Sequence, residues 1–144
     1  TFIYGTDLNP DFVSYAKRGI YEPRLFEPYQ KNYLEAGGLD NFNNYMKMEG
    51  DDLSVEILLK GHTMFAMHNL GGDGIFNEFQ FIVCRNVLIY FETELQEKVI
   101  DMFYHSLCPF GFLCIGDKES IRPERFSKKF KVVDRELRIY QRVD

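Results

Sequence analysis

The sequence predicts an α/β fold in which a mostly parallel sheet carries an antiparallel hairpin at its C-terminal end. Short apolar runs that end in polar residues alternate with segments of helical periodicity, and this alternation is typical of a parallel sheet. One run, residues 79–84, is apolar at nearly every position, as expected for a strand buried on both faces. Two further apolar runs, residues 130–133 and 137–140, flank a charged tripeptide. They predict the hairpin, which we place at the edge of the sheet.

The first predicted strand, residues 2–7, ends at Asp7 and precedes a helix with clear capping signals. Asn9 is a favoured N-cap residue, and Pro10 suits the first helical position. Gly19 suits the residue just after the helix, where a left-handed backbone is common. These signals predict a strand and a helix joined by a short turn.

Residues 21–60 differ from the rest of the chain, because prolines and glycines interrupt them and aromatic residues are scattered among them. We predict short helices here and a small hairpin between residues 45 and 58. Residues 63–68 then predict a second strand of the main sheet, followed by a glycine-rich turn at residues 71–74. Since a strand follows this turn rather than a helix, we exclude a phosphate-binding loop.

The longest predicted helix begins at Thr93, which has the spacing of a capping box with Gln96. Apolar residues at helical spacing continue this helix to Leu107. The Pro-Phe-Gly sequence at residues 109–111 predicts its end, and residues 112–116 predict a fourth strand.

Length and composition indicate a single globular domain. The chain has 144 residues, of which 45% are hydrophobic and 27% charged, and this composition excludes a disordered protein. The net charge of −5 argues against non-specific nucleic-acid binding. No apolar run approaches the roughly 18 residues of a membrane span. Without an initiator Met or a signal peptide, the chain is expected to start inside a longer protein or to have been trimmed.

The cysteines and histidines predict a reducing, cytoplasmic location and no metal site. No C-x-x-C pair occurs, and the histidines share no ligand-like spacing with the cysteines. Two of the cysteines, Cys84 and Cys114, lie in apolar runs, where cysteine behaves as a small buried hydrophobe.

Ligands in open α/β sheets bind beyond the carboxyl ends of the strands, and polar residues follow several predicted strands there. Asp7 is placed to accept the two hydroxyls of a ribose, or else to act as an acid near a helix start. Asn69 carries a donor and an acceptor that suit an adenine edge, or else it is a turn residue. Gly116 and Asp117 follow the fourth strand in the same way.

Arg85 stands out because it interrupts a long, mostly apolar stretch. A guanidinium in such surroundings needs an anion or several acceptors, since an unpaired buried charge is costly. Arg85 is therefore either half of a structural ion pair or a residue that binds an anionic substrate. Tyr90 is near enough in sequence to share its pocket, and the alternative for Tyr90 is a half-buried core tyrosine.

Residues 84–91 have the sequence CRNVLIYF, which resembles the C-R-N-V-x-I-Y-F signature of the CheR-type chemotaxis receptor methyltransferases. That family transfers methyl groups from S-adenosylmethionine to glutamate side chains. Shorter matches occur in the same order along nearly the whole chain: residues 5–8, 19–21, 68–70, 109–113 and 116–119. Lys118 stands where the family usually has Ser, and Gly5 where it has Ala.

The resemblance implies a Rossmann-like, class I S-adenosylmethionine-dependent methyltransferase sheet and roles for individual residues. Asp7 would bind the ribose hydroxyls of S-adenosylmethionine, whose product is S-adenosylhomocysteine. The adenine would lie between Asn69 and Leu70. A cleft for cofactor and substrate would be lined by Cys84 and Arg85, and Tyr90 would lie beside the transferring methyl group.

The resemblance also implies that the sheet is incomplete at its N-terminal end. The family's helical domain, its first strand and its glycine loop have no match here, so we expect residues 1–144 to be part of a catalytic domain, with residues 21–60 as a small inserted subdomain. Strands 2–7 and 79–84 would then each have an unpaired edge. We expect the 144 residues alone to be inactive and to self-associate through such an edge.

The implied partner is the cytoplasmic domain of methyl-accepting chemotaxis receptors, without nucleic acid and without membrane insertion. In some family members the inserted subdomain docks a receptor peptide by strand addition, which residues 21–60 would allow. Two alternatives to a protein-glutamate methyltransferase stay open. One is a CheR-like binding module without turnover. The other is a Rossmann oxidoreductase, because Asp7 suits a nicotinamide dinucleotide equally well.

Overall fold

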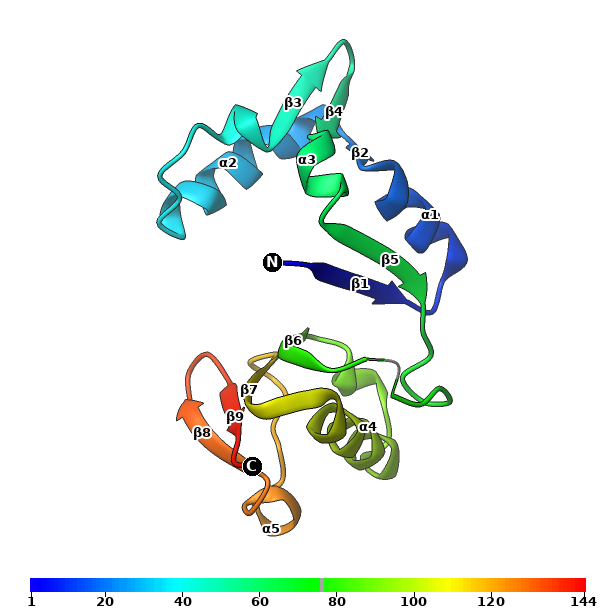
Figure 1. Cartoon of the computed structure of the whole chain (residues 1–144), viewed down its shortest axis with the longest axis vertical. Coiled ribbons are helices and arrows are strands. Elements are labelled where there is room, and N and C mark those ends of the chain that lie inside the picture. The colour runs from blue at the N-terminus through cyan, green and yellow to red at the C-terminus, as the bar shows by residue number, and fades with distance from the viewer. Residues whose placement is uncertain (76) are drawn as a thin grey trace. The chain divides into compact units, whose positions relative to one another are not determined.

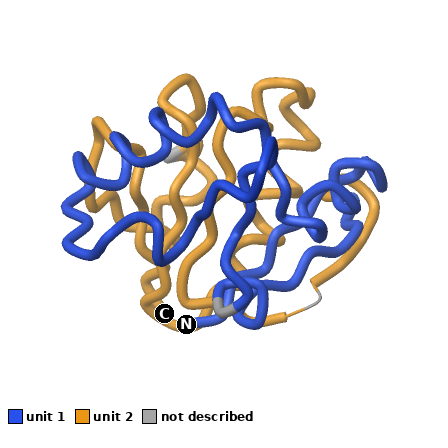
Figure 2. The backbone as a smooth tube through the Cα atoms, turned by 90° about the horizontal axis from the view of Figure 1, so that it is seen from above, with its two compact units in different colours: residues 1–69 blue, residues 70–144 orange. Residues whose placement is uncertain are grey.

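The structure is a computed structural model that describes residues 1–75 and 77–144. The chain divides into two compact units, Thr1–Asn69 and Leu70–Asp144, which Figure 2 colours separately. Each unit contains parallel strands and at least one helix (Figure 1). The α/β class expected from the sequence is therefore confirmed.

The main sheet of the first unit consists of two parallel strands, β1 (Ile3–Asp7) and β5 (Thr63–Met67). Helix α1 (Pro10–Arg18) begins just after β1. The side chain of Asn9 accepts a hydrogen bond from the Asp11 amide at 2.8 Å, and Gly19 ends the helix with a left-handed φ of 63°. The predicted strand, helix and both caps are confirmed.

A second, antiparallel sheet in the first unit has the order β2-β4-β3, from β2 (Ile20–Tyr21), β4 (Asp52–Val55) and β3 (Met46–Glu49). Its β3–β4 pair is the hairpin predicted between residues 45 and 58. The accompanying helical segments are η1 (Pro23–Leu25), α2 (Phe26–Glu35), η2 (Phe42–Asn44) and α3 (Ile57–Lys60). A small core forms around the buried side chains of Phe42, Met46 and Leu53.

The second unit contains a four-stranded sheet of order β6-β7-β9-β8. The strands are β6 (Phe79–Cys84), β7 (Leu107–Ile115), β8 (Phe130–Asp134) and β9 (Ile139–Arg142). Pairing is parallel between β6 and β7 and antiparallel in the two other pairs, so the predicted C-terminal hairpin lies at the sheet edge as expected. Three helical segments complete the unit: η3 (Leu88–Tyr90), α4 (Thr93–Ser106) and α5 (Pro123–Phe126).

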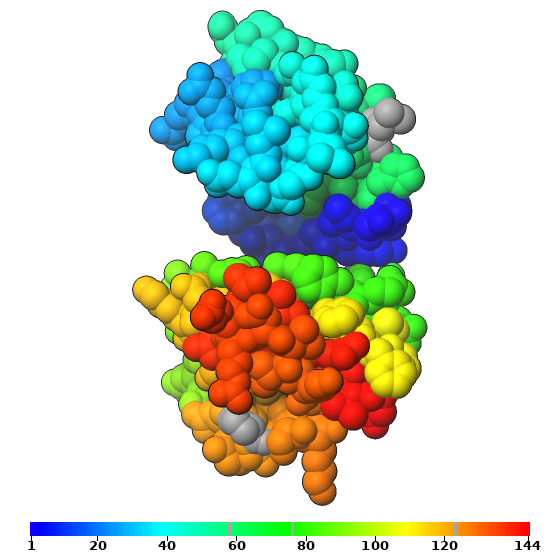
Figure 3. All heavy atoms as spheres, turned by 90° about the vertical axis from the view of Figure 1, so that its left-hand side faces the viewer, coloured from blue at the N-terminus to red at the C-terminus, as the bar shows by residue number. Residues whose placement is uncertain are grey.

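The core of the second unit forms where α4 packs on β7. Its most deeply buried side chains come from these two elements and from α5: Val99, Leu107, Leu113, Ile115 and Phe126. In the space-filling view of Figure 3, the orange and red C-terminal residues form much of the visible face of this unit. No helix in the described ranges is both long enough and apolar enough to cross a membrane.

The expectation of a mostly parallel sheet is not confirmed. Parallel pairing joins β1 to β5 and β6 to β7, whereas the other pairings among the described strands are antiparallel. The expected burial of residues 79–84 on both faces is also wrong at three positions, because Gln80 is exposed, Phe81 is 55% exposed and Val83 59%. Phe81 and Val83 share one face of β6, whereas the core of the second unit packs against the opposite face, which carries Ile82 and Cys84.

The predicted capping box at the start of α4 is wrong. Glu92 occupies the N-cap position and its side chain makes no capping hydrogen bond. The side-chain Nε2 of Gln96 instead donates to the carbonyls of Leu88 at 3.0 Å and Phe91 at 2.9 Å. The helix thus begins one residue earlier than a capping box requires, so that Thr93 is its first helical residue rather than its N-cap.

The predicted end of this helix also differs. The helix stops at Ser106, and Leu107, expected on the helix face, is the first residue of β7 and pairs with Phe79. A register shift follows, because Phe81 pairs with Phe112. Residues 108–111 are therefore an irregular part of the strand, in which Phe110 has a left-handed φ of 63°.

The exposed apolar edge strand predicts self-association of the 144-residue polypeptide. Unpaired strand edges recruit other chains, and a lysine on the edge opposes this. We expect Val83→Lys to lower the association constant by about 10-fold, because pairing at the edge would then bury a charge. Sedimentation velocity at several concentrations measures the effect.

The matched control is Val133→Lys on β8, which is the other edge strand of the same sheet and already carries Lys131. It should leave association almost unchanged. A wild-type polypeptide that stays monomeric at high concentration would contradict the prediction.

Candidate functional site

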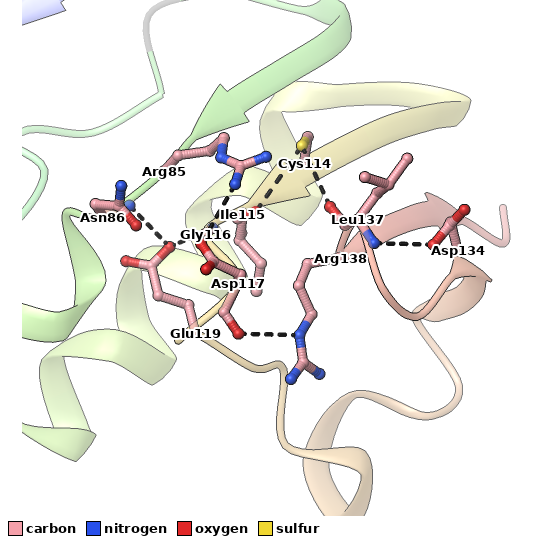
Figure 4. A network of polar contacts seen from close by, with 10 residues as sticks. All are labelled: Arg85, Asn86, Cys114, Ile115, Gly116, Asp117, Glu119, Asp134, Leu137 and Arg138. Atoms are coloured by element: carbon pink, nitrogen blue, oxygen red, sulfur yellow. Dashed lines mark hydrogen bonds and ion pairs between the residues drawn. The ribbon is translucent and has the colours of Figure 1, made fainter.

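The carboxyl ends of β6 and β7 lie side by side, because Cys84 pairs with Ile115 in a parallel register. Each strand leads directly into a polar loop, with Arg85 and Asn86 after β6 and Gly116 and Asp117 after β7. Figure 4 shows the contacts that join these loops. This edge is where open α/β sheets bind their ligands.

The side chain of Glu119 holds the two loops together. It is 5% exposed, and its Oε2 accepts hydrogen bonds from the amides of Gly116 at 2.5 Å and Asn86 at 3.2 Å. Its Oε1 accepts from the amide of Ile89 at 3.3 Å. Hydrogen bonds from backbone amides to an ionised carboxylate are stronger than neutral ones, so they compensate for removing this charge from water.

Asn86 and Gly116 are suited to this arrangement by their backbone requirements. Asn86 has a left-handed φ of 59°, a conformation that Asn tolerates better than most residues. A Cβ on Gly116 would lie 2.6 Å from Oδ1 of Asn86 and 2.8 Å from Oε2 of Glu119. Only glycine therefore allows the carboxylate to approach the backbone so closely.

Arg85 pairs with Asp117, but the burial that would make an anion necessary is not found, because the Arg85 side chain is 42% exposed. Nη2 of Arg85 lies 3.3 Å from Oδ1 of Asp117, at the end of the neighbouring strand. Arg138, just before β9, donates from Nε to the main-chain carbonyl of Asp117 at 3.3 Å. Both guanidinium groups thus reach the same residue (Figure 4).

Tyr90 is the last residue of η3 and is 80% exposed, so its interpretation as a half-buried core tyrosine is wrong. The core position in this segment belongs instead to Leu88, which is buried. The tyrosine hydroxyl is therefore accessible to a ligand.

Cys84 is buried at the end of β6, as expected for a cysteine in an apolar run. Burial, with a smaller contribution from the negative charge of Glu119, raises the pKa of the Cys84 thiol to about 12. The side chain is consequently a neutral, apolar surface at physiological pH rather than a nucleophile.

In the first unit, Asp7 is the last residue of β1 and pairs with Met67, the last residue of β5, and Asn69 follows β5 by two residues. The Asp7 side chain is exposed, and its Oδ1 accepts a hydrogen bond from the Asn9 amide at 2.8 Å. Within the described part of the chain, its Oδ2 accepts none. The contact with Asn9 shows that Asp7 does support the helix start, and it leaves one oxygen available to a ligand.

The predicted site residues therefore fall into two groups. Asp7 and Asn69 belong to the first unit, whereas Leu70, Cys84, Arg85 and Tyr90 belong to the second. Leu70 packs against the core of the second unit. The part of the chain that the structure describes contains no group of three His, Cys, Asp or Glu side chains placed to hold a metal ion.

Two residues of the network were not predicted as part of a site. Glu119 appears in the sequence only within the match at residues 116–119, and the signal that points to it is an acid closely following an apolar strand and a glycine. Arg138 carried no signal, because it lies in a turn that the sequence assigns to a strand.

Comparison with known protein families gives a match over almost the whole chain. The family model described as "CheR methyltransferase, SAM binding domain" matches residues 1–139. The putative methyltransferase Cher3 of Pseudomonas putida is 38% identical over 142 residues, which cover 99% of this chain and 52% of that protein. A chemotaxis protein methyltransferase of Listeria monocytogenes is 31% identical over 119 residues, covering 83% of this chain and 42% of that protein.

A chemotaxis protein methyltransferase of Vibrio parahaemolyticus is 29% identical over 135 residues, covering 91% of this chain and 45% of the relative. The chain thus spans about half the length of these relatives or somewhat less.

The network around Glu119 predicts a stability effect. Glu119→Gln replaces one acceptor oxygen by a donor that faces backbone amides, so we expect the free energy of unfolding to fall by about 1–3 kcal/mol. Denaturant unfolding followed by circular dichroism measures it. The control is Glu124→Gln, which changes an exposed acid of α5 and should shift the value by less than about 0.5 kcal/mol. Equal effects of the two substitutions would argue against a structural role for Glu119.

Proposed function

The chain belongs to the CheR methyltransferase family, and from this premise we propose that the protein methylates glutamate side chains of chemotaxis receptors. Family membership implies a class I methyltransferase fold and S-adenosylmethionine as the cofactor. The observation that carries the proposed substrate is the accessible Arg85 guanidinium at the carboxyl end of β6, which already binds a carboxylate.

The residues present fit this cofactor. Asp7 offers an exposed carboxylate with one oxygen available, which is the chemistry that binds the hydroxyls of a ribose. We propose that Asn69 and Leu70 contact the adenine and that Cys84 contributes a neutral wall to the cofactor cleft. When bound, S-adenosylmethionine supplies an electrophilic methyl group on a positively charged sulfur.

The proposed chemistry asks little more than positioning from the protein. A glutamate side chain has a pKa near 4.3, so at neutral pH it is already an anionic nucleophile and needs no general base. Arg85 would orient this carboxylate through charge-assisted hydrogen bonds, and the exposed Tyr90 hydroxyl would add another donor. Holding the reacting groups in line supplies the rate enhancement.

The names of relatives from Vibrio and Listeria, which are chemotaxis protein methyltransferases, support a role in chemotaxis. We propose accordingly that the partner is the cytoplasmic domain of methyl-accepting receptors, that the protein works in the cytoplasm, and that residues 1–144 form part of its catalytic domain. Residues 21–60 would be an inserted subdomain, which the small core around Phe42 supports.

The full-length protein, labelled S-adenosylmethionine and receptor cytoplasmic fragments test this function. We expect base-labile label in the receptor, as methyl esters release methanol in alkali. S-adenosylmethionine binding without transfer would instead favour a CheR-like binding module. Binding of NAD in place of S-adenosylmethionine would favour an oxidoreductase.

The proposed ribose contact predicts that Asp7→Ala weakens S-adenosylmethionine binding by about 10- to 100-fold, because charge-assisted hydrogen bonds are lost. Calorimetry on the full-length protein measures the dissociation constant. The control Asp11→Asn changes a nearby acid in the first turn of α1 and should leave that constant within about 2-fold. An unchanged constant for Asp7→Ala would remove Asp7 from the proposed site.

The proposed substrate contact predicts that Arg85→Ala lowers kcat/KM by about 100-fold or more. The free energy of unfolding should fall by less than about 1 kcal/mol, because the pair with Asp117 is half-exposed. Arg125→Ala, which removes another half-exposed arginine paired to Glu97, is the matched control and should retain activity. If activity follows only the folded fraction, Arg85 is structural.

A further inference from the structure

The ion pair between Arg85 and Asp117 has the properties of an exchangeable contact. One guanidinium nitrogen, Nη2, reaches one carboxylate oxygen at 3.3 Å, so the pair is not the two-pronged arrangement that arginine and carboxylates form at best. The side chains are 42% and 65% exposed. Ion pairs with this much solvent contact contribute little to stability, so a second carboxylate could replace Asp117 at small cost.

The main chain around Asp117 is fixed, although its side chain is not. Arg138 donates to the Asp117 carbonyl at 3.3 Å, and the preceding Gly116 amide is held by Glu119. The Glu119 amide in turn donates to the Gly116 carbonyl at 2.9 Å. Rotation of the Asp117 side chain would therefore release Arg85 without any movement of the loop (Figure 4).

From this geometry we infer that Asp117 is a positioning residue that holds the Arg85 guanidinium until a substrate carboxylate replaces it. The ion pair between Asp117 and Arg85 then forms again once that carboxylate has become an ester. The inference rests on the proposed function and adds a residue to the same site. Asp117 contacts Arg85 rather than the substrate, and it acts as an internal competitor for the substrate position.

The charges of the proposed reaction explain why the exchange would run in both directions. The carboxylate oxygen bonds to the methyl carbon as the carbon–sulfur bond breaks, and the electron pair of that bond stays on sulfur. An anion and a sulfonium cation become a neutral ester and a neutral thioether. The ester oxygen is a weaker partner for a guanidinium than a carboxylate is, so Asp117 competes better against product than against substrate.

The sign of one binding change tests this inference. While Asp117 occupies Arg85, that arginine cannot bind a substrate carboxylate, so the protein's apparent affinity for the carboxylate is reduced in proportion. Removing the Asp117 carboxylate therefore tightens substrate binding. For the full-length protein saturated with S-adenosylhomocysteine, we expect Asp117→Asn to bind N-acetyl-L-glutamate N-methylamide about 3- to 10-fold more tightly. Its γ-methyl ester should also bind more tightly. Both affinities are measured by NMR titration.

Two further variants serve as controls for the binding measurement. Asp117→Glu keeps the carboxylate and should bind both probes with affinities near those of the wild type. Glu94→Gln removes an exposed acid that pairs with Lys98 within α4, and should change neither affinity. A purely structural role for Asp117 predicts the opposite sign, so equal or weaker binding of the carboxylate probe by Asp117→Asn overturns the inference.

Methyl transfer by the same proteins separates this inference from the proposed function. With receptor fragments as substrate, Asp117→Asn should lower KM without raising kcat, because the product would leave more slowly. If the wild type transfers methyl groups and Asp117→Asn has an unchanged KM, the exchange is refuted and the proposed function stands. If Asp117→Asn binds the carboxylate probe more tightly but the wild type transfers no methyl group to the receptor fragments, the proposed function is refuted and the carboxylate exchange stands.

Discussion

The buried carboxylate of Glu119 is the interaction on which the second unit's candidate site depends. It accepts hydrogen bonds from backbone amides of two loops that are far apart in sequence, at Asn86 and Gly116. A carboxylate removed from water must have such partners, so its burial and the loop conformations require each other. The left-handed Asn86 and the absence of a Cβ at Gly116 both follow from this requirement. Arg85 and Asp117, the neighbours of these two residues, are thereby brought within reach of each other.

The two acids of this edge have different physical roles because their burial differs. Glu119 is inaccessible and bonded to the backbone, so it fixes geometry. Asp117 is mostly exposed and holds Arg85 through one long contact, so its pairing is easily exchanged. A site that orients an anionic nucleophile needs a rigid frame and an accessible cation. The arrangement at the ends of β6 and β7 provides both.

The strand edges also bear on the fold. The sequence led us to expect an unpaired edge on residues 2–7 and on residues 79–84. Among the described strands β1 pairs with β5 alone and β6 with β7 alone, so each has one edge without a described partner. The exposed Phe81 and Val83 on β6 are large apolar side chains of the kind that edge strands usually avoid. The surface of β6 is therefore poorly suited to remain in water by itself.

The sequence by itself determined the features that depend on near neighbours. These include the strand that ends at Asp7, the caps of α1 and the C-terminal hairpin, and the motif at residues 84–91 indicated the family. The tertiary structure decided where α4 ends, because Leu107 leaves the helix to pair with Phe79. It also decided the partners of Glu119 and Arg138, whose contacts join residues 33 and 21 positions apart. Caps and turns are set by a few adjacent residues, whereas such contacts exist only once the strands have paired in one register.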